Sequence, residues 1–91
     1  MNSLSLVHKM TTTNVILLKT LNQEQFKSIK EIQTNLGLIG INLSQRNIYA
    51  KLESLASKKL CHQKWEEGKK FYGLSEIGEW ELDLFKKQLL A

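Results

Sequence analysis

Two runs of alternating apolar and polar residues place the tightest limit on what this chain can fold into. The runs are residues 60–65 and 69–74, and Glu66, Glu67 and Gly68 separate them. Alternating runs around a three-residue turn that ends in glycine predict a β-hairpin. The rest of the chain has helical spacing, so we expect a mainly helical domain that carries one hairpin.

Two helices are predicted in the first part of the chain. The first opens after Thr11-Thr12-Thr13, stops at Asn22-Gln23 and is apolar on most of its circumference, so it should be central in the core. The second follows Ser28-Ile29-Lys30-Glu31, whose spacing is that of a capping box. Gly37 is its expected C-terminal stop. Residues 26–27 between them are expected to form a short connector.

A third helix is predicted from Ser44, as N-cap, to about Lys59. Ile48, Leu52 and Leu55 are spaced by four and three residues and should form one buried stripe. The order helix, helix, helix and hairpin describes a helix-turn-helix with a hairpin appended.

A fourth helix is predicted after Ser75. Its acidic residues come early and Lys86 and Lys87 come late, which suits the helix dipole. Apolar residues cover more of its surface than one core could use. We therefore expect this helix to contact a partner as well as its own domain.

The positive charge of the chain is concentrated in residues 44–70. This stretch has seven basic and three acidic residues, whereas the rest has six of each, so the stretch carries the whole net charge of +4. A basic helix and hairpin on a neutral body are typical of a small nucleic-acid-binding domain. A nucleic acid is therefore the expected partner.

Other features of the sequence narrow the class of protein. Ninety-one residues make one domain, within which residues 1–12 are expected to be a tail or a dimer arm, and either Met1 or Met10 could be the start. No apolar run approaches the roughly 20 residues of a membrane span. The single cysteine, Cys61, and the absence of an export signal indicate the cytoplasm.

No chemistry of catalysis or metal binding is indicated. The sequence has no phosphate-binding glycine loop and no nucleophile with a base, so we expect no enzyme activity. His8 and His62 are far apart, and Cys61 and His62 should point to opposite faces of a strand. We expect no metal and no cofactor, and we expect Cys61 to be buried under the hairpin.

Leu43–Leu55 resembles the recognition-helix segment of winged helix-turn-helix transcription regulators, most closely of the PadR-type group and next of the MarR-type. Residues 71–78 are similar to the Tyr-x-Leu-Thr-x-x-Gly pattern that closes their wing, with Ser75 in place of threonine. At the exit of the third helix, where relatives commonly have glycine, this chain has Lys59. The resemblance covers residues 14–85.

This resemblance implies an α+β, mainly α fold: a three-helix core, a two-stranded β wing and a C-terminal helix. It also implies a homodimer, with residues 76–91 as the dimerisation helix and each third helix in a DNA major groove. The expected interface residues in the C-terminal helix are Trp80, Leu84, Phe85 and Leu89.

Candidate DNA-binding residues follow from this arrangement. The first turns of a recognition helix face base edges, where Arg46 could pair with guanine and Gln45 or Asn47 with adenine. The full set on this helix is Ser44, Gln45, Arg46, Asn47, Tyr49 and Lys51. Lys64, Lys69 and Lys70 of the wing would contact phosphates. The alternatives are a solvated helix face and a hairpin whose lysines protect an exposed edge.

The function expected from the sequence is a sequence-specific DNA-binding regulator, a homodimeric repressor on a pseudo-palindromic operator. Two alternatives stay open: a winged helix that binds another protein, and a plasmid or viral replication or partition factor. Trp65 and Trp80 could bind a small-molecule effector, as in some PadR-like regulators. We favour a wing anchor for Trp65 and a dimer-core residue for Trp80, since aromatic residues dominate ordinary core and interface burial.

Overall fold

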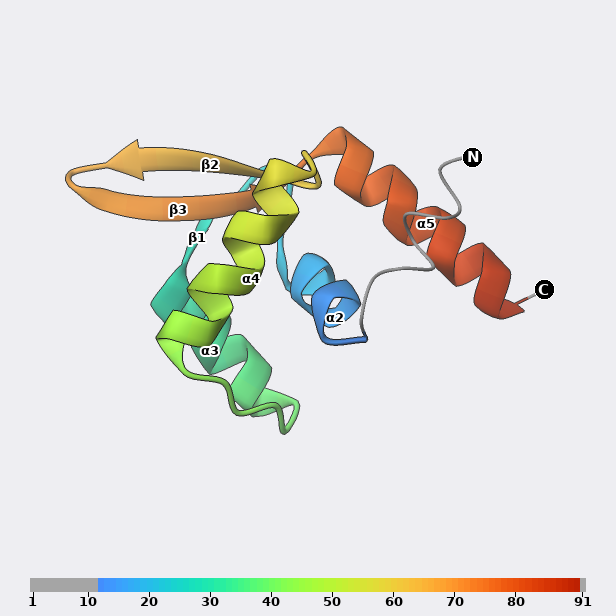
Figure 1. The fold of residues 1–91 in the computed structure, drawn as a ribbon, viewed down its shortest axis with the longest axis horizontal. Coiled ribbons are helices and arrows are strands. Elements are labelled where there is room, and N and C mark those ends of the chain that lie inside the picture. Colours follow the sequence, from blue (N-terminus) through green and yellow to red (C-terminus); the bar gives the residue numbers. More distant parts are fainter. Residues whose placement is uncertain (1–11, 91) are drawn as a thin grey trace.

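The structure, a computed structural model, describes residues 12–90, and the side chains of 12–87. The predicted tail or arm at 1–12 lies outside this range except for Thr12. The elements are α2 (Thr12–Thr20), β1 (Lys27–Ser28), α3 (Ile29–Leu38), α4 (Gln45–Ser57), β2 (Cys61–Glu66), β3 (Lys69–Leu74) and α5 (Glu76–Leu90). The hairpin of β2 and β3 extends from one end of the molecule and α5 from the other (Figure 1).

Helix α3 begins as the sequence predicts and ends later. The Ser28 hydroxyl accepts a hydrogen bond from the Glu31 amide, and the Glu31 carboxylate accepts one from the Ser28 amide, which confirms the capping box. The prediction that Gly37 ends the helix is wrong. The stop is Gly40, whose φ of 84° allows the Ile41 amide to reach the Leu36 carbonyl at 2.9 Å.

Helix α4 has the predicted cap and buried stripe. Ser44 accepts a hydrogen bond from the Asn47 amide, and Ile48, Leu52 and Leu55 are fully buried. The end of this helix has the same pattern of hydrogen bonds as the end of α3, since the Leu60 amide bonds the Leu55 carbonyl at 3.0 Å. Here the left-handed residue is Lys59, with φ 64°. Lys59 therefore adopts a left-handed conformation that favours glycine, and it does so at the position where the resemblance predicts glycine.

The predicted hairpin is present, but its turn is shorter than expected. Glu66 pairs with Lys69, so only Glu67 and Gly68 form the turn, with φ of 51° and 77°. Positive φ at both positions is the geometry of a two-residue hairpin turn that matches the twist of the strands.

The sheet has one strand more than the two-stranded wing that the resemblance implies. The short connector at Lys27–Ser28 forms β1, which pairs antiparallel with Tyr72 and Phe71 of β3. The strand order is β1-β3-β2. This third strand joins the base of the hairpin to the start of α3, so the hairpin is attached to the helical body through β1.

The segment Tyr72–Gly78, which resembles the wing-closing motif, connects the hairpin to α5. Two of its motif residues, Ser75 and Gly78, have clear structural roles. Ser75 donates a hydrogen bond to the Lys59 carbonyl at 2.7 Å and accepts one from the Gly78 amide at 2.8 Å, which confirms it as the cap of α5. A Cβ at Gly78 would overlap the Leu60 carbonyl oxygen. The glycine therefore lets α5 leave close to the start of β2.

One hydrophobic core lies under these elements. Its fully buried residues come from α2, α3 and α4 and from the base of the hairpin, and include Leu17 and Leu18, which confirms that the first helix is central. Leu82 of α5 also belongs to it. Among residues 12–90, no helix is both long enough and apolar enough to cross a membrane.

Candidate nucleic-acid interface

Three structural elements lie toward one end of the long axis of the molecule. The N-termini of α3 and α4 and the tip of the hairpin all lie toward the left end of Figure 1, whereas α5 lies at the right end. Helix N-termini carry partial positive charge and unpaired amides. This end is therefore favourable for anions before any side chain is considered.

The N-terminal half of α4 presents its predicted residues to solvent. Arg46 and Asn47 are exposed, and among residues 12–90 their side chains make no hydrogen bond or ion pair. Tyr49 is 46% exposed, so its ring does not belong to the core. Lys51 is half-buried beside the stripe, as expected. Arg46 and Asn47 are therefore available to a ligand without loss of a hydrogen bond or ion pair to another described residue.

Ser44 and Gln45 have structural partners instead. Ser44 is the N-cap of α4, and the Gln45 amide group donates to the Gln33 side-chain oxygen at 3.3 Å. Gln33 also donates to the Leu43 carbonyl at 2.9 Å. Gln33 of α3, which the sequence did not single out, thus ties the turn between α3 and α4 to the first turn of α4.

A carboxylate on α4 joins this helix to the hairpin. One oxygen of Glu53, Oε2, accepts three hydrogen bonds: from Gln63 at 2.8 Å, from Lys70 at 2.6 Å and from Tyr72 at 2.7 Å. Gln63 is on β2, and the other two donors are on β3. We call these four residues the Glu53 cluster. It fixes the hairpin against the side of α4.

The charges in the Glu53 cluster are strongly coupled. Hydrogen bonds from Lys70 and Tyr72 lower the pKa of the Glu53 carboxyl, so it is ionised at neutral pH. Burial, followed by the hydrogen bond to Glu53, raises the pKa of Tyr72, which keeps its hydroxyl protonated as a donor. The cluster is therefore a charge-assisted network, and each donor in it depends on the negative charge of Glu53.

Lys70 was predicted to contact phosphate, and the structure gives it a different environment. Its side chain is 15% exposed, and its ammonium is bound to Glu53. The rings of Trp65, Tyr49 and Tyr72 surround this ammonium with centroids 5.5 to 5.7 Å away. The positive charge of Lys70 is thus already compensated within the domain.

The other two predicted wing lysines differ from each other. Lys64 forms an exposed ion pair with Glu66 at 3.2 Å, and its ammonium lies 5.1 Å from the Phe26 ring centroid. Lys69 is exposed at the hairpin tip and makes no ion pair with any residue of 12–90. Of the three wing lysines, Lys69 is therefore the one whose charge is uncompensated.

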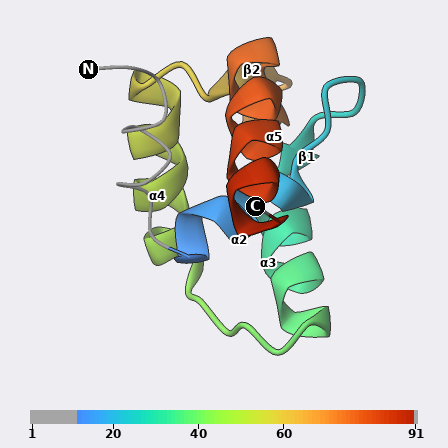
Figure 2. The same cartoon turned by 90° about the vertical axis from the view of Figure 1, so that its right-hand side faces the viewer.

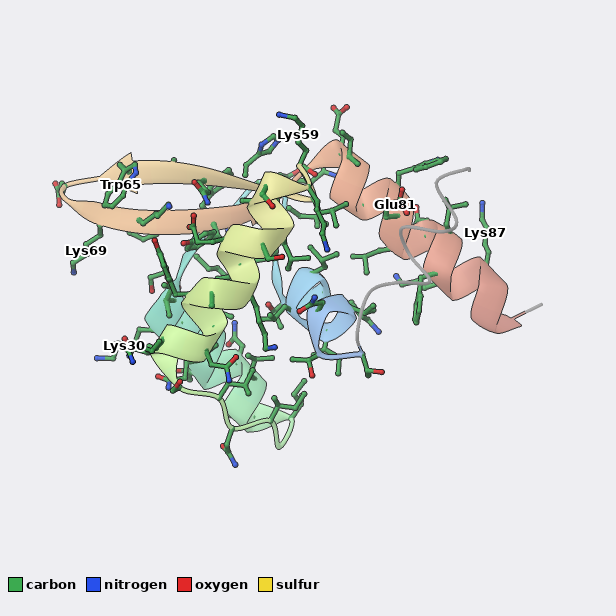
Figure 3. All side chains as sticks on the ribbon, in the orientation of Figure 1. Lys30, Lys59, Trp65, Lys69, Glu81 and Lys87 are labelled. Carbon is green, nitrogen blue, oxygen red and sulfur yellow. The ribbon has the colours of Figure 1, made fainter. Side chains whose placement is uncertain are left out.

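Lys30 belongs to the same end of the molecule, although the sequence did not single it out. It lies in the first turn of α3, is exposed, and extends toward the same end as Lys69, whereas Lys59 and Lys87 lie elsewhere (Figure 3). The sequence signal that could have identified Lys30 is its place as the second residue of α3, the first helix of the expected helix-turn-helix. The two lysines are far apart in the sequence, so only the fold brings them to one end.

The residues expected at a dimer interface divide into two groups. Leu84 and Phe85 pack partly against the core of their own domain. Trp80 is 52% exposed and Ile77 is 48% exposed, one turn apart on α5. The side chain of Leu89 lies outside the described part. Figure 2 shows α5 along the outside of the molecule, in front of α2.

Cys61 is buried, as expected, and its thiol donates to the Leu52 carbonyl at 3.6 Å. Burial, with a smaller contribution from Glu53, raises the pKa of this thiol to about 11. It is therefore not a thiolate at neutral pH, which disfavours a redox sensor. No group of three or more metal-ligating side chains occurs within the described residues.

The arrangement was compared with known proteins. No protein-family model matches the chain, and no curated protein does. Among solved structures, the complex of hsRosR-S4 aligns with a TM-score of 0.84 at 18% identity, covering 98% of this chain and 78% of that one. A PadR family transcriptional regulator from Eggerthella lenta aligns with a TM-score of 0.77 at 21% identity, over 94% and 77% of the two chains.

Two further structures have the same architecture. The MepR–DNA complex of S. aureus aligns with a TM-score of 0.75 at 19% identity, over 93% of this chain and 68% of that one. The type III plasmid segregation protein TubR aligns with a TM-score of 0.71 at 17% identity, over 96% and 87%. The chain has the winged helix-turn-helix fold. In this fold α3 and α4 are the helix-turn-helix, and the β2–β3 hairpin, residues 61–74, is the wing.

Proposed function

We propose that this winged helix is a sequence-specific double-stranded-DNA-binding regulator of transcription that acts as a homodimeric repressor. The observation that carries the proposal is that the α4 N-terminus with Arg46, and the side chains of Lys30 and Lys69, all lie toward one end of the molecule. These side chains are exposed and uncompensated by the described residues. Such a surface attracts phosphates and leaves the first turns of α4 free for base edges.

The similarity to the MepR–DNA complex and to the PadR family regulator supports this proposal, because these two structures align over 93% and 94% of this chain. In the proposed mechanism, α4 enters the major groove and the wing lies along the adjacent backbone. Arg46 would form a bidentate contact with guanine, Asn47 a contact with adenine, and Lys69 and Lys30 contacts with phosphates. A bound dimer would occlude a promoter.

The dimer is part of the proposal. Ile77 and Trp80 are exposed apolar residues one turn apart on α5, and α5 lies at the end of the molecule opposite the proposed DNA end. A second α5 packed on these residues would place two copies of α4 for half-sites separated by one or two turns of about 10 base pairs. Sedimentation of the full chain at micromolar concentration should give a dimer, and Trp80→Ala should shift it toward monomer.

The test of DNA binding is selection followed by titration. The protein would enrich duplexes from a random-sequence pool, and anisotropy would measure its affinity for the enriched duplex against unrelated competitor. We expect a palindromic consensus, binding that survives the competitor, and a steep fall of affinity with salt. Absence of enrichment, with no binding at low salt, would contradict the proposal and favour a protein-binding winged helix.

A role in plasmid segregation is the second candidate, because TubR has the same fold. The two roles differ in the arrangement of sites. A repressor binds one or two pseudo-palindromes at a promoter, whereas a segregation factor would bind an array of repeats. Footprinting on the DNA around the gene distinguishes them: one protected site supports repression, and a regular series of protected repeats supports segregation.

A further inference from the structure

Trp65 is the most exposed aromatic side chain among the described residues that is also built into the sheet. It is 68% exposed and lies on β2, close to the hairpin tip. A large apolar ring in water adds nothing to the core, and the sequence expectation that it anchors the wing by burial is not met. Its position therefore needs another explanation.

The ring of Trp65 lies on the side of the hairpin that faces α4. Successive strand residues alternate between faces, so Trp65 shares a face with Gln63, whose side chain reaches Glu53 on α4. Trp65 also pairs across the strands with Lys70. Figure 3 shows the ring on the hairpin beyond the point where α4 and the hairpin diverge.

The ring has a partner within the domain before any ligand binds. Lys70 lies with its ammonium 5.5 Å from the Trp65 ring centroid and 2.6 Å from Glu53 Oε2. The same ammonium lies 5.7 Å from the Tyr49 ring centroid. Trp65 and Tyr49 thus flank one cation, with one ring on the wing and the other on α4. A contact surface that is already ordered loses little entropy on binding.

We propose that Trp65 is a DNA-contacting residue, and that the sugar-phosphate strand between the two grooves passes over the exposed faces of Trp65 on the wing and Tyr49 on α4, outside Lys70. This inference rests on the proposed DNA binding. If α4 enters the major groove and the wing follows the adjacent backbone, the strand that separates the grooves must cross the angle between them. The apolar faces of its deoxyriboses would pack on the Trp65 ring.

Charge complementarity favours this occupant over a protein. The surfaces on either side of Trp65 carry the cations Lys69, at the tip, and Arg46, on α4. Of the two carboxylates at the tip, Glu66 is paired with Lys64, and Glu67 has no ion pair among the described residues, so positive charge is in excess among the unpaired side chains. An apolar protein partner would have to desolvate these charges, whereas a phosphodiester strand neutralises them. Lys70 then acts as a positioning residue, because its charge is already used by Glu53 and its stem supports both rings.

The test compares the full chain with its Trp65→Phe variant, so that the difference between their emission spectra reports Trp65 alone. Saturation with the duplex that the protein enriches from a random pool should move Trp65 emission to shorter wavelength, as the ring leaves water. Trp65→Ala should weaken binding roughly tenfold. The salt dependence of DNA binding should be the same in Trp65→Ala as in the parent, because an uncharged ring releases no counterion from the DNA on binding. His62→Ala, exposed on the opposite face of the hairpin, should keep the parent affinity.

The outcomes separate this inference from the function on which it rests. If the parent protein binds the duplex, an unchanged Trp65 emission at saturation overturns the inference and leaves DNA binding intact. An affinity of Trp65→Ala within about twofold of the parent does the same. A change in sedimentation of Trp65→Ala without DNA would instead assign the ring to a protein contact. If the parent binds no duplex at all, the first titration shows that the function itself has failed.

Discussion

The ammonium of Lys70 lies 2.6 Å from Oε2 of Glu53, so a charge that belongs to the wing is bound to α4. This ion pair also receives hydrogen bonds from Gln63 and Tyr72. The relative orientation of wing and helix therefore depends on one carboxylate. Loss of its charge leaves Lys70 in a partly buried position without its counterion.

Glu53→Gln should lower the free energy of unfolding by about 1 kcal/mol at neutral pH. The pKa of Glu53 is lowered in the folded state, so its contribution is present above the unfolded value of 4.5 and is lost as the pH falls through the folded value. Urea unfolding of both proteins from neutral to acid pH measures this. The stabilities should converge in acid. Glu66→Gln, in an exposed ion pair, is the control and should change little.

Lys59→Gly should raise the free energy of unfolding by about 1 kcal/mol. Lys59 has φ 64°, which is strained for a residue with a Cβ and free of strain for glycine. Lys58→Gly is a matched control, because it removes the same charge at φ −91°. That variant should be less stable than the parent. Thermal unfolding of the two variants measures these changes. Equal destabilisation by both glycines would contradict the prediction.

Gly78→Ala should destabilise the domain by about 3 kcal/mol, because the new methyl group would overlap the Leu60 carbonyl and push α5 away from β2. Gly37→Ala is the opposite case, since a Cβ there meets nothing within 4 Å. It should stabilise α3 by about 0.5–1 kcal/mol. Denaturant unfolding of the two variants checks both signs. A loss of stability in Gly37→Ala would mean that this glycine ends the helix after all.

Glu81→Gln should raise stability at neutral pH by about 1 kcal/mol. The Glu81 side chain is buried, and its Oε2 has no hydrogen-bond partner among the described residues. Burial raises the pKa of Glu81, so folding favours the protonated carboxyl of the parent protein. The resulting contribution to the parent's stability is complete below the unfolded pKa of 4.5 and is lost as the pH rises through the folded pKa. The advantage of the variant should therefore vanish in acid. The exposed Glu79→Gln should show no such dependence.

Two substitutions test the proposed division between base and phosphate contacts. Arg46→Ala should cost about 1–3 kcal/mol on the enriched duplex and relax preference at one base pair. Lys69→Ala should weaken all duplexes alike and flatten the salt slope by about one ion. Anisotropy titrations at several salt concentrations separate the two effects. Unchanged specific affinity in Arg46→Ala would show that α4 is not the recognition helix.

Interactions between near neighbours in the chain were predictable from the sequence. The caps at Ser28, Ser44 and Ser75 join groups only three residues apart, so the residue types alone indicate them. The buried stripe of α4 and the hairpin follow from periodicity in the same way. The resemblance of residues 71–78 to a wing motif correctly implied the fold, and the structure supplies its physical basis in Ser75 and Gly78.

Contacts between distant residues were decided only by the tertiary structure. Glu53 and Lys70 are 17 residues apart, and nothing in either local pattern shows that one neutralises the other. The same holds for β1, which is a strand only because β3 lies beside it, and for Lys30, which joins Lys69 at one end. The sequence alone determined the helices and the hairpin, because helix caps and periodicity are local. Packing decided which of the basic side chains remain free, because that depends on what the fold places beside each one.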